Sequence, residues 1–147
     1  MRRVALAGAA TLCVAVILTW AVRMGSQVWS TAQITRGKGL YDSHCASCHG
    51  KKLQGQPDWK SPLANGRMPA PPHDGSGHSW HHSDEALIGI TKFGLKPYVN
   101  AAYESDMPAF GATLSDEDIA AVWAYIKSTW PDRQRAYQVQ ITRQDAD

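Results

Sequence analysis

The chain has 147 residues and a mass of 16.1 kDa, which corresponds to one domain with short appendages. Hydrophobic residues make up 44% and charged residues 19%, a balance that excludes a disordered chain and a polytopic membrane protein. The 15 basic and 13 acidic residues exclude nucleic-acid binding by bulk positive charge, and the three cysteines are too few for a disulfide framework or a four-cysteine zinc site.

Residues 1–23 are predicted to form a single transmembrane anchor. Residues 4–22 carry no charge and approach the roughly 20 apolar residues that a membrane-spanning helix needs. Arginines at positions 2 and 3 stay on the cytoplasmic side, which places the rest of the chain in the periplasm, at the outer face of a bacterial inner membrane. A cleaved signal peptide is the alternative, although the cleavage signal is poor. Cys13 then belongs to the anchor as a small apolar residue, and residues 24–35 form a tether.

The exported part begins with a predicted helix over residues 31–45. Gly37 and Gly39 lie inside it, and each glycine costs a helix about 1 kcal/mol. The close approach of another helix is the reason that we expect for both. The five prolines and five glycines of residues 50–82 predict a loop with at most one short turn.

Two further helices follow, each begun by a serine N-cap and acidic residues. The first starts at Ser83 and stops at Gly94, and the second starts at Ser115 and ends before Pro131. Residues 131–147 are polar and are expected to fray. No strand is predicted. The apolar faces of the two helices are predicted to contain Ala86, Leu87, Ile90, Phe93, Ile119, Val122, Trp123 and Ile126.

The chemistry of the sequence is concentrated in the motif Cys45-Ala-Ser-Cys48-His49, which is the attachment sequence of a c-type haem. Thiols three residues apart on a helical turn reach the two vinyl groups of one porphyrin and form thioethers. The adjacent His49 donates an imidazole nitrogen to the iron. The sequence lacks the βαβ setting of a thioredoxin-like pair, and it has no further cysteine for zinc outside the anchor. The predicted cofactor is one covalent haem c.

The second iron ligand is predicted to be Met107. A thioether is a soft ligand that raises the reduction potential of a histidine-ligated haem. Pro108 and Phe110 follow Met107 and give the stiff apolar turn that a ligand loop needs. Met68 and a histidine remain as alternative ligands, and core filling is the alternative role of Met107.

The stretch from Gly37 to Gly50 is similar to the opening helix and haem site of class I cytochromes c, and residues 119–127 resemble their C-terminal helix. The resemblance covers residues 36–130. It implies an all-α cytochrome c fold with three to five helices around one haem. The sequences GHSWHHSDE and DMPAF also resemble those of a bacterial subgroup of small, often membrane-anchored monohaem cytochromes c.

In the family that the sequence resembles, the first and last helices cross at right angles. A glycine and an aromatic residue of one helix meet an aliphatic and an aromatic residue of the other. Gly37 and Tyr41 match the first pair, and Val122 and Tyr125 match the second. This crossing would account for a glycine within the first helix.

The resemblance also implies that the second ring nitrogen of His49 donates a hydrogen bond to a carbonyl near a loop proline. The candidates are Pro69, Pro71 and Pro72, of which Pro71 is favoured. The chain departs here from the Gly-Pro-x-Leu form that is commonest in the family.

Four histidines, His73, His78, His81 and His82, fall within ten residues and offer ligands for copper or zinc. The alternative is that they line the rim of the haem pocket. Trp80 is predicted to pack on the porphyrin, and His78, Trp80 or His81 is expected to bond a haem propionate.

Two protein ligands on the iron favour a one-electron carrier over an enzyme. The alternatives are a haem subunit of a membrane oxidoreductase, a peroxidase-like haem enzyme and, less favoured, a copper-handling protein. The predicted partners are respiratory redox proteins, namely a quinol-oxidising complex, a terminal oxidase or a dehydrogenase. No nucleic acid is expected, and the chain is predicted to be a monomer.

Overall fold

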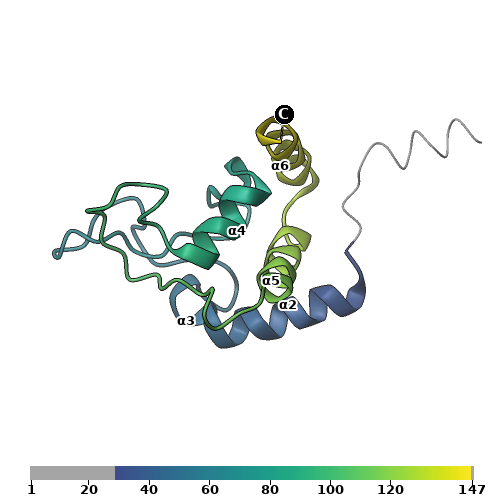
Figure 1. The fold of residues 1–147 in the computed structure, drawn as a ribbon, viewed down its shortest axis with the longest axis horizontal. Coiled ribbons are helices and arrows are strands. Elements are labelled where there is room, and N and C mark those ends of the chain that lie inside the picture. The colour runs from purple at the N-terminus through teal and green to yellow at the C-terminus, as the bar shows by residue number, and fades with distance from the viewer. Residues whose placement is uncertain (1–28, 147) are drawn as a thin grey trace, which may run out of the picture.

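The computed structural model describes residues 29–146, which are all-helical (Figure 1). The helices are α2 (Thr31–His44), α3 (Ala46–His49), the short 3-10 helix η1 (Ser79–His81), α4 (Asp84–Phe93), α5 (Asp116–Ser128) and α6 (Asp132–Asp145). Five α-helices and no strand in this part of the chain agree with the predicted all-α class. None of these helices is both long and apolar enough to cross a membrane. The predicted anchor, residues 1–23, and Cys13 lie outside the described residues.

The centre of the fold is the crossing of α2 and α5 (Figure 1). A Cβ atom added at Gly37 would lie 1.9 Å from the carbonyl oxygen of Ala121, so only a glycine fits there. The rings of Tyr41 and Tyr125 lie beside this contact with their centroids 5.6 Å apart. Gly39, by contrast, faces open space. Close packing therefore explains Gly37, and the same expectation for Gly39 is wrong.

The helix ends follow from local signals in the sequence. Ser83 caps α4, where its hydroxyl accepts from the backbone N–H of Ala86, and Gly94 ends the helix with a φ of +79°. Ser115 and Asp118 form a reciprocal capping box at the start of α5. These starts and stops are the ones that the sequence predicts.

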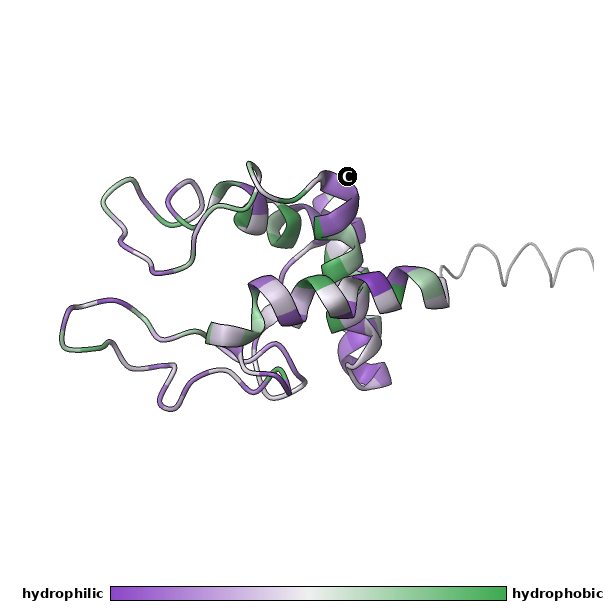
Figure 2. Ribbon diagram, turned by 90° about the horizontal axis from the view of Figure 1, so that it is seen from below, coloured by the Kyte–Doolittle hydropathy of each residue, from purple (hydrophilic) through white to green (hydrophobic). Residues whose placement is uncertain are grey.

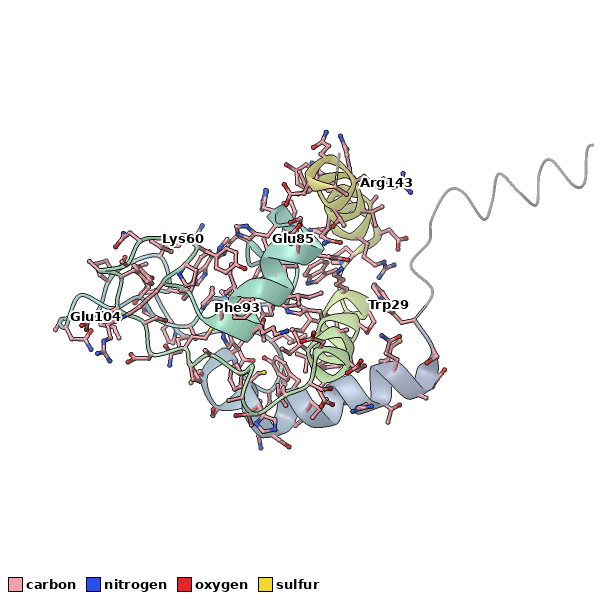
Figure 3. All side chains as sticks on the ribbon, viewed as in Figure 1. Trp29, Lys60, Glu85, Phe93, Glu104 and Arg143 are labelled. Carbon is pink, nitrogen blue, oxygen red and sulfur yellow. The ribbon has the colours of Figure 1, made fainter. Side chains whose placement is uncertain are left out.

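The core forms around α5, which packs against both α2 and α4. It includes Tyr41, Leu87 and the predicted inner face of α5, namely Ile119, Val122, Trp123 and Ile126. Phe93 departs from the prediction, because its side chain is 58% exposed at the end of α4. In Figure 3, Phe93 lies at the end of α4 nearest to the long irregular segments.

The C-terminal residues correct another prediction, because residues 132–145 form helix α6 and not a frayed tail. Gln138 is 1% exposed, and its side-chain amide donates to Asp84 Oδ1 at 2.5 Å and to Thr142 Oγ1 at 2.9 Å. Ser83 and Asp145 are joined by a further hydrogen bond. Polar contacts thus fix α6 on α4. Helix α2 begins at Thr31, as the sequence predicts, so residues 31–35 of the predicted tether belong to α2.

Two long irregular segments, residues 50–78 and 94–115, extend to the same side of the helices (Figure 1). Seen from below in Figure 2, they leave the helices as two arms. We name them the first arm and the second arm. The motif with Cys45, Cys48 and His49 lies at the base of the first arm, and Met107 lies in the second.

Candidate haem-binding site

The two cysteines of the motif lie on either side of one tight turn. Cys45 ends α2 and precedes α3, and its carbonyl accepts hydrogen bonds from the N–H groups of Cys48 at 3.2 Å and His49 at 2.9 Å. Both thiols are free, and Cys48 is exposed while Cys45 is partly buried. Burial, with a smaller contribution from Cys48, raises the pKa of Cys45 to about 11. One helical turn therefore carries two free thiols, one exposed and one partly buried, next to His49.

His49 is buried, and one of its ring nitrogens is already engaged. Its Nδ1 lies 2.8 Å from the carbonyl oxygen of Pro71, to which it donates. Burial lowers the pKa of His49, and the hydrogen bond to Pro71 partly offsets this effect. The neutral ring with Nδ1–H committed leaves Nε2 with the lone pair that a metal needs. Pro71 is the proline that the sequence favours for this contact.

Gly55 leaves the space that the backbone of residues 70–72 needs to approach His49. A Cβ atom at Gly55 would lie 2.7 Å from the carbonyl carbon of Pro71 and 2.5 Å from the nitrogen of Pro72. The backbone of Gly55 has a φ of +67°, and its N–H donates to the carbonyl of His49 at 2.8 Å. The chain after the motif therefore folds back under His49 and lets residues 70–72 approach it.

Met107 lies partly buried in a turn of the second arm. Its N–H donates to Ser105 Oγ at 3.0 Å. Just after it, the N–H of Phe110 donates to the carbonyl of Thr91 at 3.0 Å, and the N–H of Gly111 donates to that of Lys92 at 2.9 Å. These bonds attach the turn to α4. The rival methionine, Met68, is 37% exposed. The role of Met107 as an iron ligand stays a prediction.

Arg67 links the two arms. Its guanidinium contacts Asp106 through Nη1 and Glu104 through Nη2, the latter at 3.1 Å. Glu104 lies near the tip of the arms in Figure 3. Sequence reasoning did not identify this link, because nothing in the sequence pairs Arg67 with residues 37 and 39 positions later.

Trp80 lies in η1 and contacts α6, and its packing on a porphyrin stays a prediction. Its ring stacks on His81 with a centroid distance of 3.7 Å and meets Tyr137 of α6 edge-on at 5.6 Å. Its indole Nε1 is buried and is the one buried side-chain nitrogen or oxygen among residues 29–146 without a hydrogen-bond partner. A buried unpaired donor costs about 1–3 kcal/mol. Trp80 therefore offers an N–H for an acceptor that the protein does not itself supply.

The remaining histidines do not gather around a common point. His73 lies against His49, with ring centroids 4.0 Å apart and planes inclined by 23°. His78 stacks on Trp59 at 5.2 Å and meets His82 edge-on. No group of three or more histidine, cysteine, aspartate or glutamate side chains suited to a metal ion occurs within residues 29–146. The contact of His73 with His49 is a feature that sequence reasoning missed.

The residues present fit a covalently attached haem. Two free thiols and a neutral imidazole with an available Nε2 lie on one turn, and a buried indole N–H lacks a partner. Cysteine pairs of thioredoxin-like or zinc proteins have no need of this adjacent, oriented histidine. The donor set thus matches the chemistry of a c-type haem.

The comparisons with known proteins agree with this site. A family model described as cytochrome c matches residues 34–130, which include the motif, both arms and α5. No curated protein and no solved structure matches the chain. Members of the matching family bind covalently attached haem c and transfer electrons through it. The chain therefore belongs to the cytochrome c family.

Proposed function

We propose that this chain carries single electrons, and that His49 and Met107 would be the two protein ligands of its haem iron. The observation that carries the proposal is the 2.8 Å contact between His49 Nδ1 and the Pro71 carbonyl. It fixes the tautomer of the ring, so that Nε2 carries the lone pair that a metal ligand needs. When bound, the haem supplies an iron that gains and loses one electron.

The attachment of the second arm to α4 supports Met107 as the other ligand. A turn that is hydrogen-bonded through Ser105 on one side and Phe110 on the other holds its side chain in a limited region. With the turn that carries Met107 and the ring of His49 both held by hydrogen bonds, the two residues would hold the iron with little rearrangement when it gains or loses an electron. Two protein ligands also keep small molecules away from the iron, which suits a carrier better than a peroxidase-like enzyme.

Trp80 is a candidate for binding a propionate group of the haem. Its unpaired Nε1–H is buried beside α6, where an acceptor would relieve the cost of the missing hydrogen bond. A haem propionate is such an acceptor. We expect Trp80→Phe, which keeps an aromatic ring and removes the donor, to weaken the retention of haem in a variant without thioethers.

The ligand assignment is tested by spectroscopy on the haem-loaded protein. We expect no carbon monoxide adduct of the ferrous protein and a weak far-red charge-transfer band in the ferric protein. Met107→Ala should remove the band and allow carbon monoxide to bind, whereas the matched variant Met68→Ala should change neither. Carbon monoxide binding to the unaltered protein would favour an enzyme with an open iron. Retention of the band in Met107→Ala would exclude Met107.

The cellular setting of the proposal rests on the sequence. Residues 1–23 would hold the monomeric haem domain at the outer face of the inner membrane. Because α2 begins at Thr31, only a short connection separates the domain from that segment. Such a connection restricts the haem to partners in the same membrane, namely a quinol-oxidising complex, a terminal oxidase or a dehydrogenase. N-terminal sequencing of the mature protein tests this, and a start near residue 24 with release by osmotic shock would contradict it.

A further inference from the structure

His73 occupies a position between the proposed iron ligand and the core. One face of its ring lies on His49, with the centroids 4.0 Å apart and the planes inclined by 23°. The ring also meets Trp123 of α5 edge-on, with the centroids 5.3 Å apart and the planes at 75°. The His73 ring therefore lies in contact with both the His49 ring and Trp123 of α5, and it connects His49 to the core.

His73 is itself held at several points. Its Nδ1 lies 2.8 Å from the hydroxyl of the buried Ser79, in η1. Its backbone N–H donates to the carbonyl of Leu53 at 2.8 Å, and its carbonyl accepts from Trp130 Nε1 at 2.7 Å. With both the ring and the backbone fixed, His73 can act as a rigid support for a neighbouring side chain.

The hydrogen bond to Pro71 does not alone determine the orientation of His49. A hydrogen bond tolerates a range of distances and angles, so the bond at Nδ1 leaves the ring some freedom to turn about its Cβ–Cγ bond. A flat group against the face of the ring limits that rotation. Pro71 contacts the edge of the His49 ring and His73 contacts its face, and both residues lie in one loop.

We propose that His73 is a positioning residue that sets the plane of the His49 imidazole, and through it the orientation of this ligand on the iron. The inference rests on the proposed function in that His49 must bind the iron. It assigns a role to a histidine that the sequence groups with possible metal ligands. His73 acts here through its flat face, and it does not bind the metal.

The test separates the ring face from the hydrogen bond to Ser79. His73→Phe keeps a flat ring and loses the hydrogen bond, whereas His73→Gln keeps polar atoms and loses the ring. In a ferric low-spin haem, the pattern of paramagnetically shifted haem-methyl resonances and the EPR g-values depend on the plane of the axial imidazole. We expect His73→Gln to reorder the methyl resonances and His73→Phe to keep the order of the unaltered protein.

Two results would overturn the proposal. One is an unchanged methyl pattern in His73→Gln, and the other is the same altered pattern in both variants. If His73→Gln does not fold, His73→Leu, which keeps an apolar side chain and loses the flat ring, takes its place and is expected to reorder the methyl resonances. Ser79→Ala keeps both imidazole rings and removes only the hydrogen bond to His73, so it should preserve the order as His73→Phe does. No change in Ser79→Ala together with an altered pattern in His73→Phe would likewise exclude the ring face.

The ligand set itself is checked separately. A far-red band and the absence of a carbon monoxide adduct in the unaltered protein establish the proposed function before any variant of His73 is compared. Failure of those two measurements would concern Met107 and the proposed function. An unaltered methyl pattern in a protein that passes them would concern His73 alone.

Discussion

The carbonyl oxygen of Ala121 occupies the space where Gly37 would carry a side chain. A Cβ atom at Gly37 would lie 1.9 Å from that oxygen and 3.1 Å from Tyr125 Cβ. The nearest obstacle is backbone, which cannot rotate away as a side chain can. The two helices α2 and α5 can therefore approach this closely only because residue 37 has no side chain.

We expect Gly37→Ala to lower the free energy of unfolding by about 1–3 kcal/mol, because α2 and α5 must separate to admit the methyl group. Gly39→Ala is the matched control. It makes the same change in the same helix at an exposed position with open space around it, and it should stabilise the protein by about 0.5–1 kcal/mol. Urea unfolding of the haem-loaded proteins measures both, and equal effects of the two substitutions would contradict the role of the crossing.

Tyr41 should make the protein sensitive to alkali. It is 0% exposed, its hydroxyl donates to the carbonyl of Gly50 at 2.8 Å, and burial raises its pKa above the ordinary value of 10.0. Above that value the unfolded chain loses the phenolic proton while the folded protein keeps it, so stability falls as the pH rises further. Tyr41→Phe should lower stability by about 1 kcal/mol at neutral pH through the lost hydrogen bond.

As the pH rises, the free energy of unfolding of Tyr41→Phe should fall less steeply than that of the unaltered protein. The free energy of unfolding measured from about pH 8 to about pH 11 tests this. Tyr98→Phe, at a ring that is 45% exposed, is expected to keep the alkaline slope of the unaltered protein. Parallel curves for Tyr41→Phe and the unaltered protein would show that Tyr41 does not cause the slope.

The Arg67 link between the arms should slow the replacement of Met107, the proposed iron ligand, by an external ligand. Arg67→Gln removes the contacts with Glu104 and Asp106, the residue directly before Met107. Exposed ion pairs contribute about 0.2–1 kcal/mol each, so the loss of both should let imidazole bind the ferric protein about two- to thirtyfold faster. Stopped-flow absorbance measures this rate.

Two comparisons check that the faster imidazole binding comes from the loss of the ion pairs between the two arms. High salt should speed imidazole binding to the unaltered protein and leave Arg67→Gln almost unchanged, because salt screens exposed pairs. Arg36→Gln breaks the ion pair with Asp118, which joins α2 and α5, and should not alter the rate. A faster rate in Arg36→Gln would indicate general loosening of the fold.

Lys51 and Lys52 are expected to guide redox partners. Both are exposed and directly follow the haem motif, and transient redox encounters are steered by charge. Lys92 is less suited, because its Nζ lies 2.6 Å from Asp116. Lys51→Glu with Lys52→Glu should slow electron transfer with an acidic partner at low ionic strength and weaken its salt dependence.

The control for this pair lies on α6, which Figure 1 shows well separated from α3, the helix that ends just before Lys51 and Lys52. Arg133→Glu with Arg143→Glu makes the same change in net charge on α6. Equal slowing by both pairs would mean that net charge matters and not the location of the lysines. Laser-flash kinetics over a range of salt concentrations distinguish the two.

The parts of the fold that the sequence predicted depend on neighbouring residues. Ser83, Gly94 and Ser115 act within one turn of the chain, so their caps can be recognised without knowledge of the fold. The spacing from Cys45 to His49 likewise spans a single turn. These signals locate three helix boundaries and the base of the site.

The parts that escaped prediction depend on partners far along the chain. Gln138 binds Asp84 across 54 positions, and its helix has no apolar stripe that would reveal a docked face. His73 meets His49 only because Gly55 lets the first arm fold back. Polar and ring contacts of this kind leave no periodic pattern in a single sequence.

The crossing of α2 and α5 should hold the protein together after a protease cut in the second arm. A protease nick between residues 97 and 102, an exposed stretch of the second arm, would leave one fragment with α2, Cys45 and His49 and another with Met107 and α5. Each fragment would keep one helix of the crossing and one proposed iron ligand. We expect the two pieces to reassociate into a native-like complex, in which peptide continuity in the second arm is dispensable.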